Sequence, residues 1–237
     1  MRLIYALLIL LLVGCEAAEG RNEEKQKIIT GTCSKEYTLT SWNAGNFGKS
    51  KSAETLVVMA DILKSSDIVF LQEVSTGPAG AQATERLQSA LDQKGTHWDS
   101  LVSDATSGDG PERYSTLWKP SRVQVQRKNS LVMDLADSID REPHENVVTI
   151  EGIFGPKGWT AHIDGKTSLK QKLGPSGEYL LYQYDHILSK GSIKVIHTRI
   201  IDFVTERYSP ITNESLRSAR LVSDHLPVSM RFQVCRS

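Results

Sequence analysis

Three short apolar segments of this 237-residue chain each adjoin a cluster of polar side chains, and this arrangement limits the folds open to it. Asn43 follows the alternating segment 37–42, Gln72 and Glu73 follow the apolar segment 67–71, and Ser223, Asp224 and His225 precede the segment 226–228. Ligand-binding and catalytic groups gather at strand ends, because the strand fixes the backbone while the loop opens to solvent. The pattern predicts a sheet with a functional edge.

The rest of the chain predicts helices early and strands throughout. Apolar residues at helical spacing predict helices at 52–65 and 81–93. Short β-branched segments between turn residues predict strands at 114–118, 123–126, 130–135, 147–150, 184–189, 193–196 and 227–234. We therefore expect one α/β (α+β) domain in which mixed sheets are layered with helices.

The first residues predict export. An apolar segment, 3–13, follows Arg2 and ends at Gly14 and Cys15. It is shorter than the ~20 residues of a membrane-spanning helix and has the length of a signal-peptide core. The cysteine after a small residue resembles a bacterial lipobox; an ordinary signal peptide is the alternative. We expect a signal peptide at 1–14, lipidation of Cys15, a polar tether at 15–35 and a domain at 36–237, hence an exported, membrane-anchored lipoprotein of the bacterial cell envelope.

The charge of the chain does not favour a tight grip on duplex DNA. Its 28 basic and 28 acidic residues balance, and removing the leader takes away only Arg2, leaving 27 against 28. Proteins that neutralise many DNA phosphates usually carry a basic face. A local basic patch on a neutral chain remains compatible with these numbers.

The polar clusters together suit phosphoester chemistry. Hard oxygen ligands hold Mg²⁺, which polarises a phosphoryl oxygen, and an imidazole assists. Taken singly, each residue has a simpler structural interpretation, with Glu73 as a solvated strand end and Asp224 as the cap of a turn.

The clusters occur in the order of three signatures of the endonuclease/exonuclease/phosphatase superfamily, which they resemble. The stretches that carry the resemblance are 40–43, 67–74 and 223–228. Three more stretches are similar to the deoxyribonuclease I branch, namely 112–120, 141–143 and 184–187. The resemblance covers about residues 37–143 and 159–234. It implies two stacked mixed β-sheets flanked by helices.

The resemblance also implies roles for single residues. Glu73 corresponds to the principal metal ligand, with Asn43 and Asp224 beside it, for Mg²⁺ or, alternatively, Mn²⁺ or Ca²⁺. In catalysis, the resemblance implies that His225 neutralises the phosphoryl oxygens, with Asp224 next to it. Asp185 would line the cleft, and Glu112 would orient a second histidine. The implied phosphate contacts are Asn43 and Arg141.

The middle of the chain departs from the family pattern. Only 23 residues separate Pro143 from Thr167, and the expected Asn-x-His and Gly-Asp-Phe-Asn motifs are absent from the sequence. The nearest substitutes, His144, His162 and Asn146, follow no strand in the required way, and an internal deletion ending near residue 144 is the simplest account. Each missing group typically contributes ~10²–10⁴-fold to the rate. We expect weakened activity and an exposed sheet edge, which a symmetric dimer is one way to cover.

A disulfide follows if Asn43 and His225 both face the site. Cys33 lies ten residues before Asn43, and Cys235 lies ten residues after His225. Antiparallel neighbouring strands of equal length then bring the two cysteines together at the far end. Closing a loop of about 200 residues stabilises a fold by about 4–5 kcal/mol in the chain-entropy model.

Three functions remain open at this stage. The first is a Mg²⁺-dependent phosphodiesterase acting on DNA or a smaller phosphodiester, tethered to a membrane by lipid, with no protein partner implied. The second is a non-catalytic lipoprotein with a residual metal- or phosphate-binding pocket, and the third is a deletion product without a function of its own.

Overall fold

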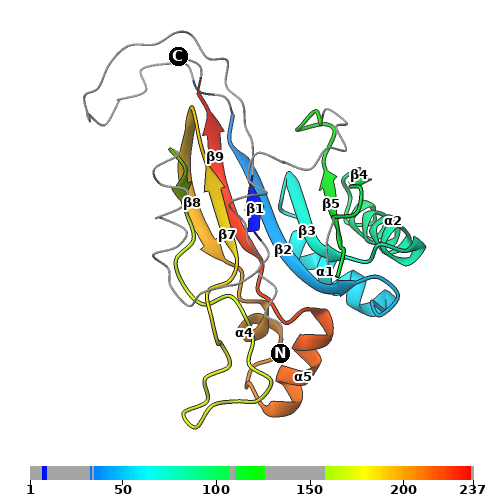
Figure 1. Ribbon diagram of the computed structural model, residues 1–237, viewed down its shortest axis with the longest axis vertical. Coiled ribbons are helices and arrows are strands. Elements are labelled where there is room, and N and C mark those ends of the chain that lie inside the picture. Colours follow the sequence, from blue (N-terminus) through cyan, green and yellow to red (C-terminus); the bar gives the residue numbers. More distant parts are fainter. Residues whose placement is uncertain (1–6, 10–32, 34, 107–109, 126–157, 236–237) are drawn as a thin grey trace.

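The computed structural model describes residues 7–9, 33, 35–106, 110–125 and 158–235 (Figure 1). Its elements are β1 (Leu7–Ile9), β2 (Tyr37–Phe47), α1 (Ala53–Leu63), β3 (Ile68–Val74), α2 (Pro78–Asp92), β4 (Asp99–Val102), β5 (Arg113–Trp118), β6 (Thr160–Ala161), β7 (His186–Ser189), β8 (Ile193–Ile200), α4 (Phe203–Arg207), α5 (Asn213–Val222) and β9 (Val228–Val234). The strands expected at 130–135 and 147–150, and the expected site residues Cys15 and Arg141, lie outside the described residues.

A six-stranded mixed sheet forms the centre of the molecule, in the order β4-β5-β3-β2-β9-β8. β2 and β3 are parallel, and their other neighbours are antiparallel. Parallel neighbours require a crossover connection, which α1 supplies. As a result, the ends of β2 and β3 lie at the same edge of the sheet.

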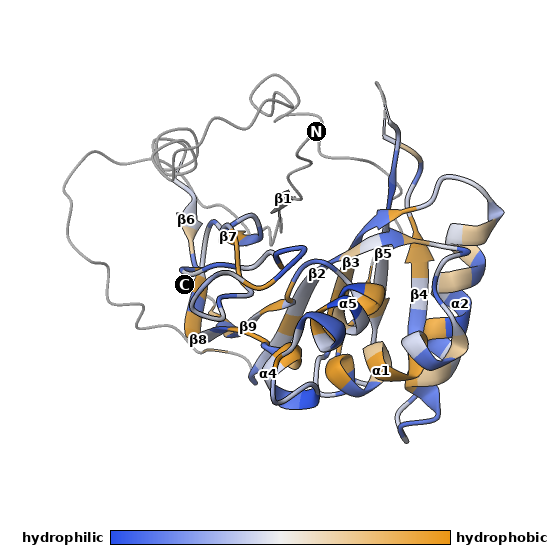
Figure 2. Cartoon of the chain, turned by 90° about the horizontal axis from the view of Figure 1, so that it is seen from below, coloured by the Kyte–Doolittle hydropathy of each residue, from blue (hydrophilic) through white to orange (hydrophobic). Residues whose placement is uncertain are grey.

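Helices α1, α2, α4 and α5 cover one face of this sheet (Figure 2). The inward side chains of α1, among them Leu56, Met59 and Leu63, belong to the same buried cluster as Trp42 of β2. The side-chain oxygen of Ser52 caps α1 by accepting a hydrogen bond from the backbone N–H of Thr55. The periodic apolar stripe and the cap together explain why the helix expected at 52–65 forms.

A smaller sheet, in the order β1-β7-β6, packs on the opposite face. A second buried cluster joins the two sheets, with Ile187 of β7 among Leu39, Val228, Met230 and Phe232 of β2 and β9. The short strand β1, which lies within the predicted leader, pairs in parallel with β7. The expected layered α/β fold with two stacked sheets is confirmed.

β2 and β9 run antiparallel, with Tyr37 opposite Phe232. Beyond that pair, Cys33 and Cys235 form a disulfide, with their Cα atoms 4.0 Å apart. The strand order and the bond are those derived from the equal spacing of the cysteines from Asn43 and His225. The disulfide closes the edge of the sheet opposite the polar strand ends.

Several elements differ from the sequence expectation. Residues 123–125 form no strand, because the backbone N–H groups of Arg122 and Val123 bond to the carbonyl of Lys119 in a turn. Helix α2 begins at Pro78, which suits the first turn of a helix. Helices α4 and α5 and strands β1, β4 and β6 were not expected. In the described residues, no helix is long and apolar enough to span a membrane.

Candidate active site

The backbone leaves regular geometry where the polar ends of β2 and β3 meet. The pairing of the two strands runs from Leu39–Ile68 to Asn43–Gln72 and then shifts register. Gly45, Asn46 and Glu73 all have positive φ, at 55°, 51° and 57°. Strain of this kind costs on the order of 1–3 kcal/mol per non-glycine residue and, with bulges, is typical of functional sites. Here it turns Glu73 toward β2.

The Glu73 carboxylate is held by β2. Its Oε1 accepts a hydrogen bond of 2.9 Å from Nδ2 of Asn43, and its Oε2 accepts one of 3.0 Å from the backbone N–H of Asn46. Asn43 is fully buried, and its Oδ1 accepts from the N–H of Gly45 at 3.0 Å. Glu73 is thus oriented by a rigid amide while it stays half-exposed.

The loop before β9 is joined to the end of β2. The Ser223 hydroxyl donates to the carbonyl of Asn43 at 2.7 Å and accepts from the N–H of His225 at 3.0 Å. The indole N–H of Trp42 donates to the carbonyl of His225 at 2.8 Å. The segments carrying Asn43 and His225 therefore form one rigid unit. The sequence pointed to the Ser223 cluster, but the linking role of its hydroxyl required the structure.

His225 and Asp185 form a buried pair, with Nδ1 of His225 2.7 Å from Oδ2 of Asp185. Burial disfavours the imidazolium, but the charge and hydrogen bond of Asp185, followed by the charges of Asp224 and Glu73, outweigh it and raise the pKa of His225. The ring of Tyr184 lies against that of His225, with centroids 5.9 Å apart. The other Asp185 oxygen, Oδ1, is buried without a hydrogen bond in the described part of the chain.

The segment 167–169 fixes both members of this pair. The Thr167 hydroxyl accepts from the N–H of Asp185 at 3.1 Å, and the Thr167 carbonyl accepts from Leu226 at 2.7 Å. The N–H of Leu169 donates to the carbonyl of Asp224 at 2.8 Å. Asp185 and His225 come from distant parts of the chain, so this short segment determines their spacing.

A buried lysine, Lys51, holds the end of α5, directly before the loop that carries Asp224 and His225. Its Nζ donates to the carbonyls of Val222 (2.9 Å) and Leu221 (3.4 Å) at the end of α5. Burial lowers the pKa of Lys51 to about 8, although the nearby charges of Asp224 and Glu73 oppose this shift. Sequence reasoning missed Lys51, because it lies in a polar stretch and lacks any pattern that indicates burial.

Asp224 lies between Gly45 and Arg220. Its Oδ2 is 3.5 Å from a guanidinium nitrogen of Arg220, and its Oδ1 would be 2.9 Å from a Cβ built on Gly45. A side chain at position 45 would therefore push on the carboxylate. The site needs glycine there both for this contact and for the positive φ.

The carboxylates of this site suit a magnesium ion better than a metal that takes all of its ligands from the protein. No group of three or more His, Cys, Asp or Glu side chains arranged for a metal occurs within the described ranges. Mg²⁺ is usually held by one or two carboxylates plus waters and substrate phosphates. Glu73, half-exposed with one hydrogen bond per oxygen, and half-exposed Asp224 fit that requirement. Asn43 directs its N–H₂ at Glu73 and so orients a ligand.

The remaining expected residues are Glu112 and Arg141, and the discounted substitutes are His144, His162 and Asn146. Glu112 is half-buried just before β5, next to the pair formed by Arg113 and Val74, and thus one strand away from Glu73. His162 lies near the second sheet, where its Nε2 is 2.6 Å from the hydroxyl of Ser189, and burial lowers its pKa. Arg141, His144 and Asn146 fall outside the described residues.

The fold is shared with an endonuclease/exonuclease/phosphatase family protein from Leptotrichia buccalis, at a TM-score of 0.51 and 13% identity, over 82% of this chain and 98% of that one. A second similar structure is TDP2 from C. elegans, at a TM-score of 0.49 and 15% identity, over 83% of this chain and 75% of that one. No family model and no curated protein matches the sequence. The first likeness shows a shared fold.

Proposed function

We propose that the protein is a Mg²⁺-dependent phosphodiesterase acting on DNA or a smaller phosphodiester. The observation that carries the proposal is the His225–Asp185 pair at the same sheet edge as Glu73 and Asn43. A buried imidazole paired with a carboxylate and an oriented, half-exposed carboxylate are the parts that phosphoester hydrolysis requires.

His225 binds the phosphate in its protonated form. An imidazolium donates from both nitrogens, and Asp185 accepts the hydrogen bond from its Nδ1–H. The Nε2 N–H is then the donor for a phosphoryl oxygen. The raised pKa of His225 favours this protonation state.

Glu73 and Asp224 would hold the magnesium ion, and Asn43 keeps Glu73 in place. When bound, Mg²⁺ polarises the phosphoryl oxygen and stabilises the leaving oxygen. Lys51 holds the loop that carries Asp224 and His225 by binding the last carbonyls of α5. Because the central motifs that orient water in the related family are absent from this sequence, we expect slow turnover.

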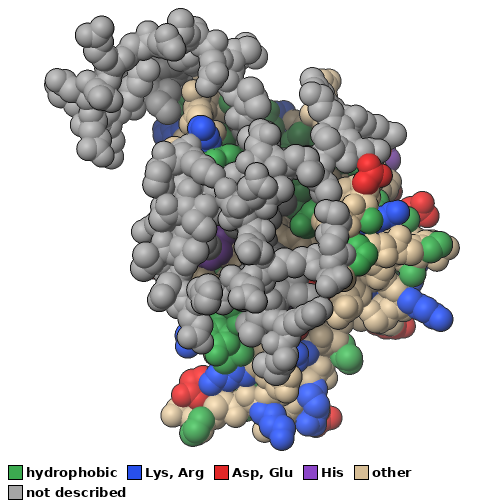
Figure 3. Space-filling model, in the orientation of Figure 1, with side chains coloured by type: hydrophobic (Ala, Val, Ile, Leu, Met, Phe, Trp, Pro, Cys, Tyr) green, Lys and Arg blue, Asp and Glu red, His purple; other side chains and the backbone are tan. Residues whose placement is uncertain are grey.

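The surface near the site suits an anionic substrate. Basic side chains gather at the end of the molecule formed by α5 and the segment before β7 (Figure 3). Lys166, Lys172 and Arg217 are exposed there, on segments next to Leu169 and Asp224. Their charge favours the approach of a phosphodiester despite the neutral chain.

We further propose that the enzyme works outside the cytoplasm. The apolar segment before Cys15 supports a signal peptide at 1–14, lipidation of Cys15 and a tether at 15–35, with the catalytic domain at 36–237. This arrangement makes the protein a lipoprotein of a bacterial cell envelope. Mass spectrometry of the membrane fraction tests it by detecting an acylated N-terminal Cys15.

The hydrolysis test uses bis(p-nitrophenyl) phosphate and plasmid DNA with Mg²⁺, with EDTA, and with two variants. We expect turnover that EDTA abolishes and that Glu73→Gln lowers at least about 100-fold. Glu85→Gln, an exposed position on α2, is the matched control and retains activity. A folded protein that binds Mg²⁺ without turnover contradicts the proposal and selects the non-catalytic alternative.

A further inference from the structure

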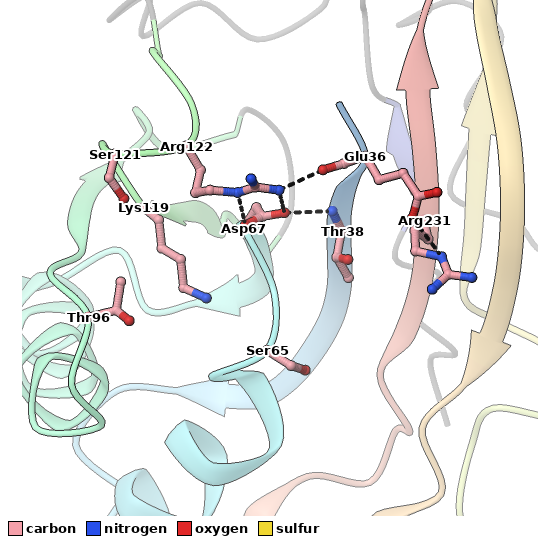
Figure 4. A pocket seen from close by; sticks show the side chains of 9 residues that line it. All are labelled: Glu36, Thr38, Ser65, Asp67, Thr96, Lys119, Ser121, Arg122 and Arg231. Atoms are coloured by element: carbon pink, nitrogen blue, oxygen red, sulfur yellow. Dashed lines mark hydrogen bonds and ion pairs between the residues drawn. The ribbon is translucent and has the colours of Figure 1, made fainter. Parts of the chain in front are cut away.

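We propose that a pocket at the disulfide end of the six-stranded sheet binds a phosphate-bearing monoanion. The cavity has a volume of about 440 Å³ and lies between the starts of β2 and β3 and the end of β5 (Figure 4). From Asp67, in the pocket, to Glu73, in the candidate active site, β3 spans six residues, or about 20 Å. The pocket is therefore separate from the site of hydrolysis.

The charges in the pocket leave one cation uncompensated. Asp67 is neutralised by Arg122, at 2.9 and 3.3 Å, and Glu36 pairs with Arg231 at 3.4 Å. Lys119 is the remaining charged residue in the lining, and it forms no ion pair in the described part of the chain. The pocket thus carries one positive charge in excess, which matches the single negative charge of a phosphodiester.

Lys119 is built into the pocket wall. Its ammonium lies 5.0 Å from the ring centroid of buried Trp98, and it donates one hydrogen bond of 2.8 Å to the carbonyl of Lys64. An ammonium has three N–H donors, so two are left for a ligand. Figure 4 shows Lys119 extending toward Thr96 and Ser65, whereas Arg122 turns to Asp67. Burial and the charge of Arg122 lower the pKa of Lys119 against the charge of Asp67, and an anion would relieve this cost.

Hydroxyl groups complete the lining. They belong to Thr38, Ser65, Thr96 and Ser121. Within the ranges that the structure describes, the side chains of these four residues make no hydrogen bond to one another or to other residues. Hydroxyls both donate and accept, so they suit phosphate oxygens as well as the hydroxyls of an attached polyol.

Two sources supply this chemistry, a phospholipid headgroup and a soluble phosphodiester. The predicted lipid tether enters the domain at Cys33 and Glu36, which are at the pocket end. A tether that starts in a membrane brings this end toward the headgroups, while the candidate active site faces the opposite direction along the sheet. Position therefore favours the headgroup, and the chemistry is common to both.

The test measures binding of glycerophosphoglycerol, a soluble phosphodiester, to the full-length protein by calorimetry. All variants carry His225→Gln, so that the candidate active site does not contribute. We expect Lys119→Gln to weaken binding about tenfold, because a charge-assisted hydrogen bond is lost. Lys190→Gln removes the same charge from an exposed position outside the pocket lining and leaves binding unchanged.

A second variant keeps the packing of Lys119 on Trp98. Ser121 is exposed at the pocket rim, so Ser121→Asp adds a negative charge without emptying the wall, and we expect it to weaken binding as well. Equal loss in Lys190→Gln, no loss in either pocket variant, or no binding at all overturns the proposal.

Vesicle flotation with the full-length chain separates the two sources. Phosphatidylglycerol in phosphatidylcholine is compared with phosphatidylcholine alone, and any lipid anchor contributes equally to every variant. A phosphatidylglycerol-dependent increase that Ser121→Asp removes identifies a headgroup site. Binding of glycerophosphoglycerol without that increase identifies a soluble ligand of the same pocket.

Discussion

The two ends of the strands in the six-stranded sheet differ in how completely their buried carboxylates are paired. At the disulfide edge, Asp67 is saturated, accepting hydrogen bonds from Arg122 and from the N–H of Thr38. At the opposite edge, Glu73 has positive φ, and a buried oxygen of Asp185 lacks a hydrogen bond among the described residues. The regular edge holds the chain together, and the irregular edge carries the chemistry that we propose.

This contrast teaches that one sheet serves both tasks by separating them along its strands. β2 begins beside the disulfide with regular pairing to β9 and ends in the bulge after Asn43. The backbone strain at the candidate active site is offset by packing and by the disulfide elsewhere in the fold. Changes at each edge should therefore affect different properties.

Removing the disulfide should have the largest effect, and it should be on stability alone. In Cys33→Ala with Cys235→Ala, a loop of about 200 residues is no longer closed, so we expect the free energy of unfolding to fall by about 5 kcal/mol. Chemical denaturation measures this change. Phosphodiester turnover should persist wherever the variant is folded, and a matching loss of activity would show that the edges are not separate.

For Asp185→Asn, at the candidate active site, we expect a loss of activity without a comparable loss of stability. Without the carboxylate, the imidazolium of His225 is less favoured, and turnover should fall about 100-fold, or about 3 kcal/mol in the barrier. Steady-state kinetics with bis(p-nitrophenyl) phosphate measure the loss. Asp164→Asn, an exposed position, serves as the control and should leave the rate unchanged.

The pH dependence follows from the raised pKa of His225. If turnover needs the imidazolium, the rate is highest below this pKa and declines as pH rises through it. The stability that protonation adds has the same sign, being fully present below the ordinary value of about 6.5 and lost as pH rises through the raised pKa. In Asp185→Asn the alkaline decline of the rate should move to lower pH, and an unmoved decline would assign it to another group.

Lys51 provides a smaller test with the opposite sign. Its pKa falls from 10.5 to about 8, so the folded protein loses this proton first and stability rises as pH increases from about 8 to 10.5. Relative to Lys51→Met, the free energy of unfolding of the wild-type protein should rise by roughly 2 kcal/mol across this pH window. This value is smaller than the full pKa shift gives, because local relaxation reduces the effect. A parallel pH profile for the two proteins would mean that Lys51 is already solvated. Lys172→Met, at an exposed position, should show no such difference from wild type.

Gly45→Ala should have the smallest effect. Gly45 and Gly95 both have positive φ, but an added Cβ meets Asp224 Oδ1 at 2.9 Å only at position 45 and meets nothing within 4 Å at position 95. Both alanine variants should lose about 1 kcal/mol of stability from backbone strain. Only Gly45→Ala should also weaken Mg²⁺ binding, by displacing the carboxylate, and equal Mg²⁺ affinities would disconnect Asp224 from the metal.

The sequence predicted the parts of the fold that have strong periodicity. The strands before Asn43 and Glu73 and the first two helices follow from apolar spacing, and the disulfide follows from strand order. Helix α5 was missed, because only Leu216, Ala219 and Val222 are buried in it. Its start is marked by a capping box between Thr212 and Ser215, which lacks the usual glutamate at the third position.

The sequence singled out the polar residues of the candidate site but not the residues that hold them in position. Asn43, Glu73 and His225 stand out as polar groups at strand ends, whereas Thr167 and Lys51 act through contacts with distant backbone. Such contacts depend on tertiary packing, which leaves no local pattern in the sequence. The positive φ of Glu73 is likewise imposed by the surrounding sheet.

The hydrogen bond from Ser223 to Asn43 joins residues 180 positions apart, so the site cannot assemble until both residues have been synthesised. A nascent chain exposes Glu73 and Asn43 first, and His225 and its linking serine emerge long after them. A chain cut short before Ser223 therefore has the acidic edge without the imidazole that completes it. The site that we propose therefore stays incomplete until Ser223 has been synthesised and packed against Asn43.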